Sequence, residues 1–269
     1  MLKRISSRAN ASFKALRALA ASSRERRKQA RTLLDGMHLV TAYAARCGLP
    51  EHLVVSEHGR RQAEIAAFLE AHPRANTLLL SDGLFAEISP VASPTGILAV
   101  IALPPPIGEG VAGGSCVLLD AIQDAGNLGS ILRSAGAAGI AEIILGPGCA
   151  DVWSPRVLRA AMGAHFGLRI SERASLAELL AGFAGTSLAT CVTGGCSLFE
   201  TDLGGPIAWL FGNEGAGLAP DIASMASRAV FIPMAGQTES LNVAAAAAIC
   251  LFEEARQKRA QQARADRSP

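Results

Sequence analysis

The chain has 269 residues, half of them hydrophobic and 18% charged, with a formal net charge of +2. This length fits one or two domains with a sizeable core. No apolar run reaches the ~18 residues that a membrane-spanning helix needs, which excludes an integral membrane protein of that type. The basic N-terminus has some likeness to a transit peptide, but no apolar stretch or small-residue cleavage site follows it. We therefore expect a cytoplasmic protein.

Six cysteines are spread along the chain, at positions 47, 116, 149, 191, 196 and 250. They form no C-x-x-C pair, and Cys116 and Cys250 lie within apolar patterns. The cysteines therefore predict reduced, mostly buried thiols, with neither disulfides nor a metal site.

Basic residues gather at the two ends of the chain. Within residues 1–31 the only acidic residue is Glu25, and the basic ones are Lys3, Arg4, Arg8, Lys14, Arg17, Arg24, Arg26, Arg27, Lys28 and Arg31. The C-terminal segment adds Arg256, Lys258, Arg259, Arg264 and Arg267. This distribution favours a polyanionic partner, with RNA or DNA ahead of a membrane. A solvated helix face with a frayed tail is the alternative.

Strand and helix patterns alternate through the first hundred residues, which predicts a small α/β domain over residues 1–103. The helices expected there are 12–21, 26–34, 35–47, 61–70 and 81–87, and the strands are 53–56, 77–80 and 96–102. The segment 104–114 holds prolines and then glycines, so we interpret it as a linker.

A second domain is expected over residues 115–269, as an unbroken run. Its strands are predicted at 116–120, 142–145, 188–192, 207–210 and 229–232, with a shorter candidate at 166–170. Ser154-Pro155 and Ala219-Pro220 both place a proline at the first position of a helix. Strands and helices that alternate in this way predict a parallel sheet with right-handed crossovers.

Three of these strands are each followed by a loop rich in Gly, Asn, Glu or Ser. The loops begin near Gly126, Gly212 and Met234, and the last one leads into the Ala-rich run 243–250. Ser240 and Asn242 are residue types that satisfy free N–H groups at a helix start. Polar loops that join a strand to a helix N-terminus are where α/β proteins bind ligands.

These loops resemble the three signature motifs of the SpoU (TrmH-like) RNA 2′-O-ribose methyltransferases of the SPOUT superfamily. The matching residues, in order, are Asn127, Gly129 and Arg133; then Gly212, Asn213, Glu214, Gly215, Gly217 and Leu218; then Ile232, Pro233, Met234, Gly236, Ser240, Leu241, Asn242 and Val243. The matches cover the whole second domain. The first domain is similar, less specifically, to the ribosomal-protein-like substrate-binding module of that family, through the helix start Leu34-Asp35-Gly36-x-x-x-Val40 and the alternation of helices and strands.

The resemblance implies a C-terminal trefoil knot, a homodimer formed through the C-terminal domain, and S-adenosylmethionine (AdoMet) bound in the knot. The implied cofactor contacts are Thr193, Gly194, Gly212, Asn213, Glu214, Ile232, Met234 and Leu241. Adenine is flat and apolar with a polar edge, so apolar side chains beside free backbone groups suit it. Gly212 would let backbone approach the ligand closely.

The resemblance also implies that Arg133, Asn127, Glu214, Ser240 and Asn242 serve catalysis. Each has a simpler interpretation: Asn127, Ser240 and Asn242 as helix caps, Glu214 as a turn residue and Arg133 as a surface charge. Arg133 is the only charged residue between Asp124 and Glu142. An unpaired buried guanidinium is costly, so we expect it to have a partner or ligand.

The expected reaction is attack of a ribose 2′-OH on the AdoMet methyl group. A guanidinium stays protonated, so Arg133 is better suited to hold a phosphate and favour the nascent alkoxide than to remove a proton. The proton acceptor is open between Glu214, water and a phosphate oxygen. Asn127, Ser240 and Asn242 would orient Arg133 and the ribose, and some of these residues would come from the second chain of a dimer. The relatives often have a serine where this chain has Glu239.

Two other functions fit parts of the sequence. A nucleotide-binding oxidoreductase would explain the glycine-rich turn after Asp120, but no G-x-G-x-x-G occurs there. A non-catalytic RNA-binding or ribosome-assembly protein of the same fold is the other alternative, and the complete set of motif residues argues against it. Aromatic residues make up only 4%, which favours reading folded RNA by shape and backbone. By analogy with relatives that carry an extra N-terminal module, we expect ribosomal RNA ahead of tRNA.

Overall fold

The computed structural model describes residues 2–105 and 113–265, and these residues form two compact units. The first unit comprises the described residues up to Pro105 together with Asp151–Phe166. The second comprises the described residues of 106–150 and of 167–269. Most of the predicted linker 104–114 and the basic residue Arg267 lie outside the described residues.

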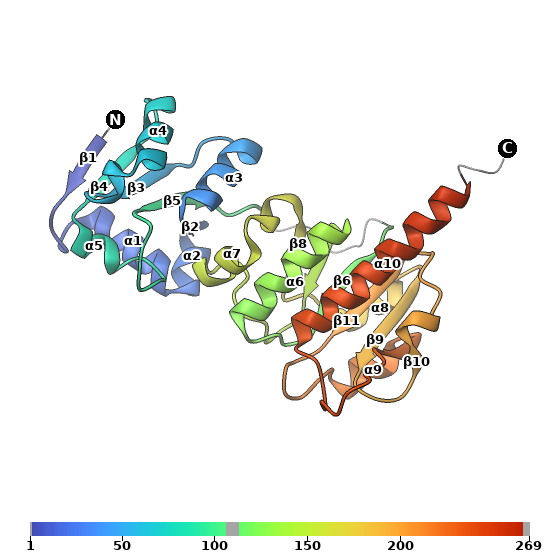
Figure 1. The fold of residues 1–269 in the computed structure, drawn as a ribbon. Helices are drawn as coiled ribbons and strands as arrows, with labels where there is room; N and C mark the ends of the chain where they lie inside the picture. Colours follow the sequence, from blue (N-terminus) through green and yellow to red (C-terminus); the bar gives the residue numbers. More distant parts are fainter. Residues whose placement is uncertain (1, 106–112, 266–269) are drawn as a thin grey trace. The chain divides into compact units, whose positions relative to one another are not determined.

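The first unit is built on a five-stranded sheet with the order β1-β4-β3-β5-β2 (Figure 1). Strand β5 runs antiparallel to its neighbours β3 and β2, whereas β1, β4 and β3 are parallel. The strand bounds are β1 Leu2–Ile5, β2 Arg31–Asp35, β3 His52–Ser56, β4 Thr77–Leu80 and β5 Ile97–Ala102. Alternation of strands with helices confirms the expected α/β class for this part of the chain.

Helices α1 and α5 pack their apolar residues on one face of this sheet, where Phe13, Leu16 and Phe85 meet Leu33 and Val54 in one core. The helices of the first unit are α1 Ala11–Ala21, α2 Ser23–Gln29, α3 Met37–Cys47, α4 Ala63–Ala71, α5 Asp82–Ala86 and α7 Pro155–Ala161, with short 3-10 turns at Gly59–Arg61 and Ala164–Gly167.

The secondary structure predicted from the sequence was wrong for two stretches of the first unit. The helix predicted over 26–34 ends at Gln29, because Ala30 takes a left-handed conformation with a φ of 49° and caps it. The buried residues that follow then form β2, which pairs with β5. Strand β1 was not predicted, because its four residues are mostly exposed and only pairing with β4 defines them as a strand.

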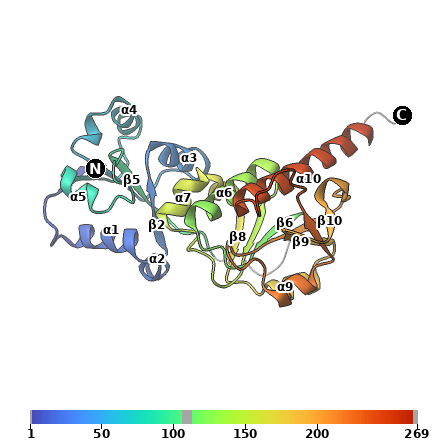
Figure 2. The same cartoon turned by 60° about the horizontal axis from the view of Figure 1, so that its bottom comes forward.

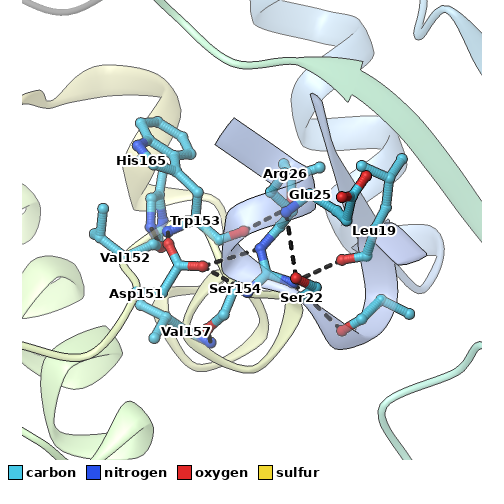
Figure 3. A network of polar contacts seen from close by, with 12 residues as sticks. Leu19, Ser22, Glu25, Arg26, Asp151, Val152, Trp153, Ser154, Val157 and His165 are labelled. Carbon is cyan, nitrogen blue, oxygen red and sulfur yellow. Dashed lines mark hydrogen bonds and ion pairs between the residues drawn. The ribbon is translucent and has the colours of Figure 1, made fainter. Parts of the chain in front are cut away.

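Residues 151–166 were predicted within the second domain, but the structure packs them in the first unit. Arg26 of α2 is buried and donates to Asp151 through Nε at 3.0 Å and also through Nη2 (Figure 3). Its Nη1 donates to the carbonyl of Leu19 at 2.6 Å. The Thr32 hydroxyl donates to the Trp153 carbonyl at 2.6 Å, and Arg159 pairs with the buried Asp35 at 2.7 Å. The contacts with Asp151, Trp153 and Arg159 join partners more than a hundred residues apart, so no local sequence pattern predicts them.

The second unit is built on a seven-stranded sheet in which every described pair is parallel, with the order β10-β12-β9-β11-β6-β7-β8. The bounds are β6 Cys116–Leu119, β7 Glu142–Leu145, β8 Arg169–Glu172, β9 Thr186–Cys191, β10 Cys196–Ser197, β11 Ile207–Phe211 and β12 Arg228–Phe231. The predicted strands are confirmed to within a few residues, and β10 was not predicted because it has only two residues.

Helices cover both faces of this sheet (Figure 2). On one face α8 (Leu176–Gly182) and α9 (Pro220–Met225) pack on alternate strand residues such as Leu118 and Leu210. On the other face α6 (Ala125–Ala138) lies beside α10 (Val243–Ala265). The buried carboxylate of Glu254 fixes α10 there, because it accepts from the Trp209 indole, the Ser115 hydroxyl and Lys258.

The described residues hold no cluster of three or more His, Cys, Asp or Glu side chains able to bind a metal ion. All six cysteines are free, and Cys116 and Cys250 are buried as predicted, whereas Cys47 and Cys196 are exposed. Burial raises the pKa of both buried thiols to about 12. Among the described helices, none combines the length and apolarity that crossing a membrane requires.

Candidate active site

A cavity of about 540 Å³ opens in the second unit where three neighbouring strands, β9, β11 and β12, end. Residues 189–192 line it at the end of β9, and residues 211–218 line it after β11. The rest of its wall comes mainly from residues between Ala229 and Cys250, which include the loop from β12 to α10. The carboxyl ends of parallel strands are the expected place for a ligand in an open α/β sheet.

Most of the residues predicted to contact a cofactor line this cavity: Gly212, Asn213, Glu214, Ile232, Met234 and Leu241. Ser240 lines it as well. Thr193 and Gly194 do not, although they directly follow the lining residue Val192. Cys191 and Val192 at the end of β9 also line the cavity and were not among the predicted contacts. The signal that could have found them is their position at the carboxyl end of a predicted strand.

Gly212 is required by the loop itself. A Cβ atom on Gly212 would lie 2.2 Å from the carbonyl carbon of Gly217 and the amide nitrogen of Leu218. The same loop is closed by reciprocal backbone hydrogen bonds of 2.9 Å between Asn213 and Gly217. Gly212 therefore makes a close backbone approach to its own loop, and this packing explains why the second motif has a glycine at this position.

One residue from each of the three motifs meets in a hydrogen-bonded chain. The Nδ2 of Asn242 donates to Oδ1 of Asn127 at 2.8 Å, and the Nδ2 of Asn127 donates to Oε1 of Glu214 at 3.0 Å. Glu214 lines the cavity, so this row of hydrogen-bonded side chains lies at the cavity's border. Asn127 is 87 positions before Glu214 and 115 positions before Asn242 in the sequence. Their convergence makes this border a candidate active site.

Of the two asparagines in this network, both of which could have been helix caps, only Asn242 caps a helix. Asp124 caps α6, accepting from the Asn127 amide at 2.8 Å, so Asn127 lies inside the first turn with its side chain free to bond elsewhere. Asn242 does act as a cap: its Oδ1 accepts from the amides of Ala244 and Ala245 at the start of α10. Asn242 thus positions a helix and joins the motif network at the same time.

Glu214 is held as an anion. Both of its carboxylate oxygens accept from backbone amides at the start of α6, Oε2 from Gln123 at 3.2 Å and Oε1 from Asp124 at 3.1 Å. Burial acts to raise the pKa of this carboxyl, but the hydrogen bonds from Asn127 and the backbone amides outweigh burial and lower the pKa below its usual value. A carboxylate with a lowered pKa is a weak base, and its lone pairs are directed to these donors.

Arg133 is exposed, which corrects the premise that it is a buried charge in need of a partner. It lies on α6, six residues after Asn127. Within residues 2–105 and 113–265 no ion pair or hydrogen bond of its side chain is observed. A solvated guanidinium is stable without a protein partner. Its donors remain available to a phosphate from outside.

Comparison with known proteins agrees with the fold and with the motifs. The model of the SpoU rRNA Methylase family matches residues 114–252. The 23S rRNA (guanosine(2553)-2′-O)-methyltransferase RlmP of Bacillus subtilis is 32% identical over 86% of this chain and 91% of its own length. The 23S rRNA (uridine(2479)-2′-O)-methyltransferase of Streptomyces viridochromogenes is 31% identical over 95% of this chain and 93% of its own.

Solved structures show the same likeness. The SpoU methyltransferase AviRb from Streptomyces viridochromogenes, crystallised with AdoMet, matches with a TM-score of 0.81 and 28% identity over 93% of this chain and all of its own. A structure described as an RNA 2′-O ribose methyltransferase matches with a TM-score of 0.81 and 31% identity, over 95% of this chain and 99% of that chain. The fold and the motifs are those of a methyltransferase. The chain belongs to the SpoU rRNA methylase family.

Proposed function

We propose that this protein is an AdoMet-dependent RNA methyltransferase that methylates a ribose 2′-OH of ribosomal RNA. The observation that carries the proposal is the convergence of all three motifs, through Asn242, Asn127 and Glu214, at the border of one cavity. The substrate class comes from the relatives, whose names describe 2′-O-methylation of 23S rRNA.

The residues of the cavity fit AdoMet. Its volume of about 540 Å³ lies in the usual range of small-molecule sites. Ile232 and Leu241 offer apolar surface to the adenine ring, and the backbone of residues 211–218 offers polar groups to its edge. Thr193 and Gly194 extend the loop that follows Val192, from which they would contact the cofactor. Bound AdoMet supplies an electrophilic methyl group on a sulfonium centre.

In this proposal Arg133 is the catalytic cation. Its guanidinium binds the phosphate next to the target ribose and favours negative charge that develops on the 2′-oxygen. Asn127, Ser240 and Asn242 orient the ribose and the start of α6. The donors around Glu214 and its lowered pKa favour a positioning role for this carboxylate, which leaves water or a phosphate oxygen as the better proton acceptors.

We propose further that the first unit is the ribosomal-protein-like module that binds the RNA substrate. Exposed Arg24, Arg27 and Lys28 on α2 support this role. The neighbouring Arg26 does not contribute, because its guanidinium is buried against Asp151. Four of the ten basic residues near the N-terminus are in ion pairs with carboxylates, so fewer charges face the RNA than the sequence suggests.

Three features carried from the family complete the proposal. The segment 232–242 lines the same cavity as the loops after β9 and β11, and this proximity supports a trefoil knot in the second unit. Phe252, 47% exposed on α10, supports a homodimer formed through the second unit. Sedimentation velocity that returns the mass of a single chain would contradict the dimer.

A ribosomal RNA substrate supports a cytoplasmic location.

The cofactor site is tested by Leu241→Arg. Leu241 is 38% exposed and lines the cavity, so the substitution leaves the core intact but places a long charged side chain in the adenine position. We expect calorimetry to show no AdoMet binding by this variant at concentrations that saturate the wild type. Met225→Arg, which also replaces an exposed apolar residue in the second unit, is the matched control. Equal AdoMet affinity in both variants would show that the cofactor binds elsewhere.

The activity itself is tested by incubating the protein with labelled AdoMet and transcripts that cover 23S rRNA. Protection of one phosphodiester bond from alkaline cleavage would locate the 2′-O-methyl group. If AdoMet binds but no transcript, ribosomal subunit or tRNA accepts the methyl group, the protein binds RNA without this chemistry.

A further inference from the structure

Asn213 uses all of its polar groups within the protein. Its side-chain Oδ1 accepts from the amides of Gly215 and Ala216, each at 3.0 Å, and its Nδ2 donates to the carbonyl of Ala121 at 2.9 Å. Its backbone N–H and C=O both bond to Gly217 at 2.9 Å. Asn213 lines the cavity, and the hydrogen bonds observed for its side chain all join it to the protein framework.

The residue that Asn213 holds has an unusual backbone. Ala121, in the loop between β6 and α6, has a φ of 52°, which is left-handed and unfavourable for a residue with a Cβ atom. Such conformations persist where the surroundings impose them, and they cluster at functional sites. Beside it, Oδ2 of Asp120 accepts from the Ala219 amide at 2.8 Å, so the loop is bound twice to the segment after β11.

The loop that contains Ala121 leads directly into α6. Gln123 and Asp124 follow it, and their amides are the ones that Glu214 binds. Asn127 and Arg133 then lie on the helix. The conformation at Ala121 therefore sets where α6 begins, and with it the position of both motif residues relative to the cavity.

We propose that Asn213 is a positioning residue with two separable functions, an inference that rests on the proposed methyl transfer. Its Oδ1 shapes the turn that walls the cofactor cavity. Its Nδ2 holds Ala121 in the left-handed conformation and so aligns α6 and Arg133 with the bound cofactor. Asn213 does not bind the cofactor through its side chain.

Asn213→Asp separates these two functions. The carboxylate keeps an acceptor for Gly215 and Ala216 but places an oxygen against the Ala121 carbonyl in place of a donor. We expect the single-turnover rate at saturating AdoMet and RNA to fall about 10²-fold, the order expected for a displacement of roughly 1 Å at a reacting centre. AdoMet affinity should stay within about 3-fold of the wild type, because the turn is kept.

Asn213→Ala removes both functions. It should lower the single-turnover rate as much as Asn213→Asp does, and it should also weaken AdoMet binding by about 10-fold or more. Hydrogen exchange gives a readout that needs no activity. Peptides covering residues 119–128 should exchange roughly 5-fold faster in both variants, whereas peptides covering residues 212–218 should do so only in Asn213→Ala. Asn76→Asp, the same substitution at an exposed asparagine of the first unit, is the control.

The proposal is wrong if Asn213→Asp keeps the wild-type rate at saturating AdoMet and RNA, or if it weakens AdoMet binding as much as Asn213→Ala does. The second result would make the side chain a direct cofactor contact. If Asn213→Asp does not fold, Asn213→Ser replaces it, because a serine hydroxyl can accept within the turn but is too short to reach Ala121. If the wild type transfers no methyl group, the proposed function fails, and hydrogen exchange still decides whether Asn213 holds the loop.

Discussion

Arg26 in the first unit and Arg133 in the second both lie on helices, and the protein uses them in opposite ways. Arg26 is buried, with its guanidinium bonded to Asp151 and to backbone carbonyls. Arg133 is exposed on α6, a helix that otherwise carries no charged residue. A buried, fully bonded arginine serves the fold, whereas an exposed one in apolar surroundings is available to a ligand. A count of basic residues in the sequence does not distinguish a structural arginine from one available to a ligand, whereas the hydrogen-bond partners in the structure do.

The largest effect on stability should come from removing Arg26. Arg26→Ala leaves the carboxylate of Asp151, itself only 15% exposed, without its cation. Breaking a buried pair in this way costs about 3–5 kcal/mol. We expect chemical denaturation to show the first unit unfolding at clearly lower denaturant concentration, with AdoMet binding by the second unit unchanged.

Arg27→Ala, on the same helix but exposed, is the control for this comparison and should change the unfolding free energy by less than ~0.5 kcal/mol. Equal stability of the two variants would show that the Arg26–Asp151 pair does not hold residues 151–166 in the first unit.

A moderate effect is expected when exposed charges of the first unit are neutralised. Replacing Arg24, Arg27 and Lys28 together by Gln should weaken RNA binding and lower the slope of log K against log salt by roughly two units, if each contacts a phosphate. AdoMet affinity and stability should not change, because all three side chains are exposed. A slope equal to that of the wild type, measured by filter binding between low and moderate salt, would leave these residues as ordinary surface charge.

The smallest effect concerns Glu214 and pH. Its folded-state pKa is lowered, so its contribution to stability is present above the unfolded value of about 4.5 and is lost as pH falls through the folded value. Melting temperatures of the wild type and Glu214→Gln should therefore run parallel from pH 7 to about 5.5 and converge below about 4.5. A difference that grows as pH falls would mean that the carboxyl is protonated in the folded protein, and would restore it as a candidate proton acceptor.

The sequence predicted much of the second unit, because its strands are continuous apolar runs and each motif follows one. Most of the residues predicted to contact a cofactor line one cavity, since strands of a parallel sheet bring the loops at their carboxyl ends together. The network itself was not predicted, because the spacing of Asn127, Glu214 and Asn242 does not reveal which atoms meet. Residues 151–166 were assigned to the wrong unit, because the partners Arg26 and Thr32 lie far away in the sequence. A truncated chain that begins after the linker would lack both partners, so the full chain is the better material for every test above.

The role of Arg133 as the catalytic cation is tested most directly by the single-turnover rate of methyl transfer to the identified RNA by Arg133→Ala. We expect a rate about 10²-fold or more below that of the wild type, the order typical of losing one preorganised electrostatic group. AdoMet affinity and thermal stability should be unchanged, because the side chain is exposed and unpaired among the described residues. Arg133→Lys should recover only part of the rate, since it keeps the charge but loses the planar donor pair. A wild-type rate in Arg133→Ala would contradict the assignment of Arg133 as the catalytic cation.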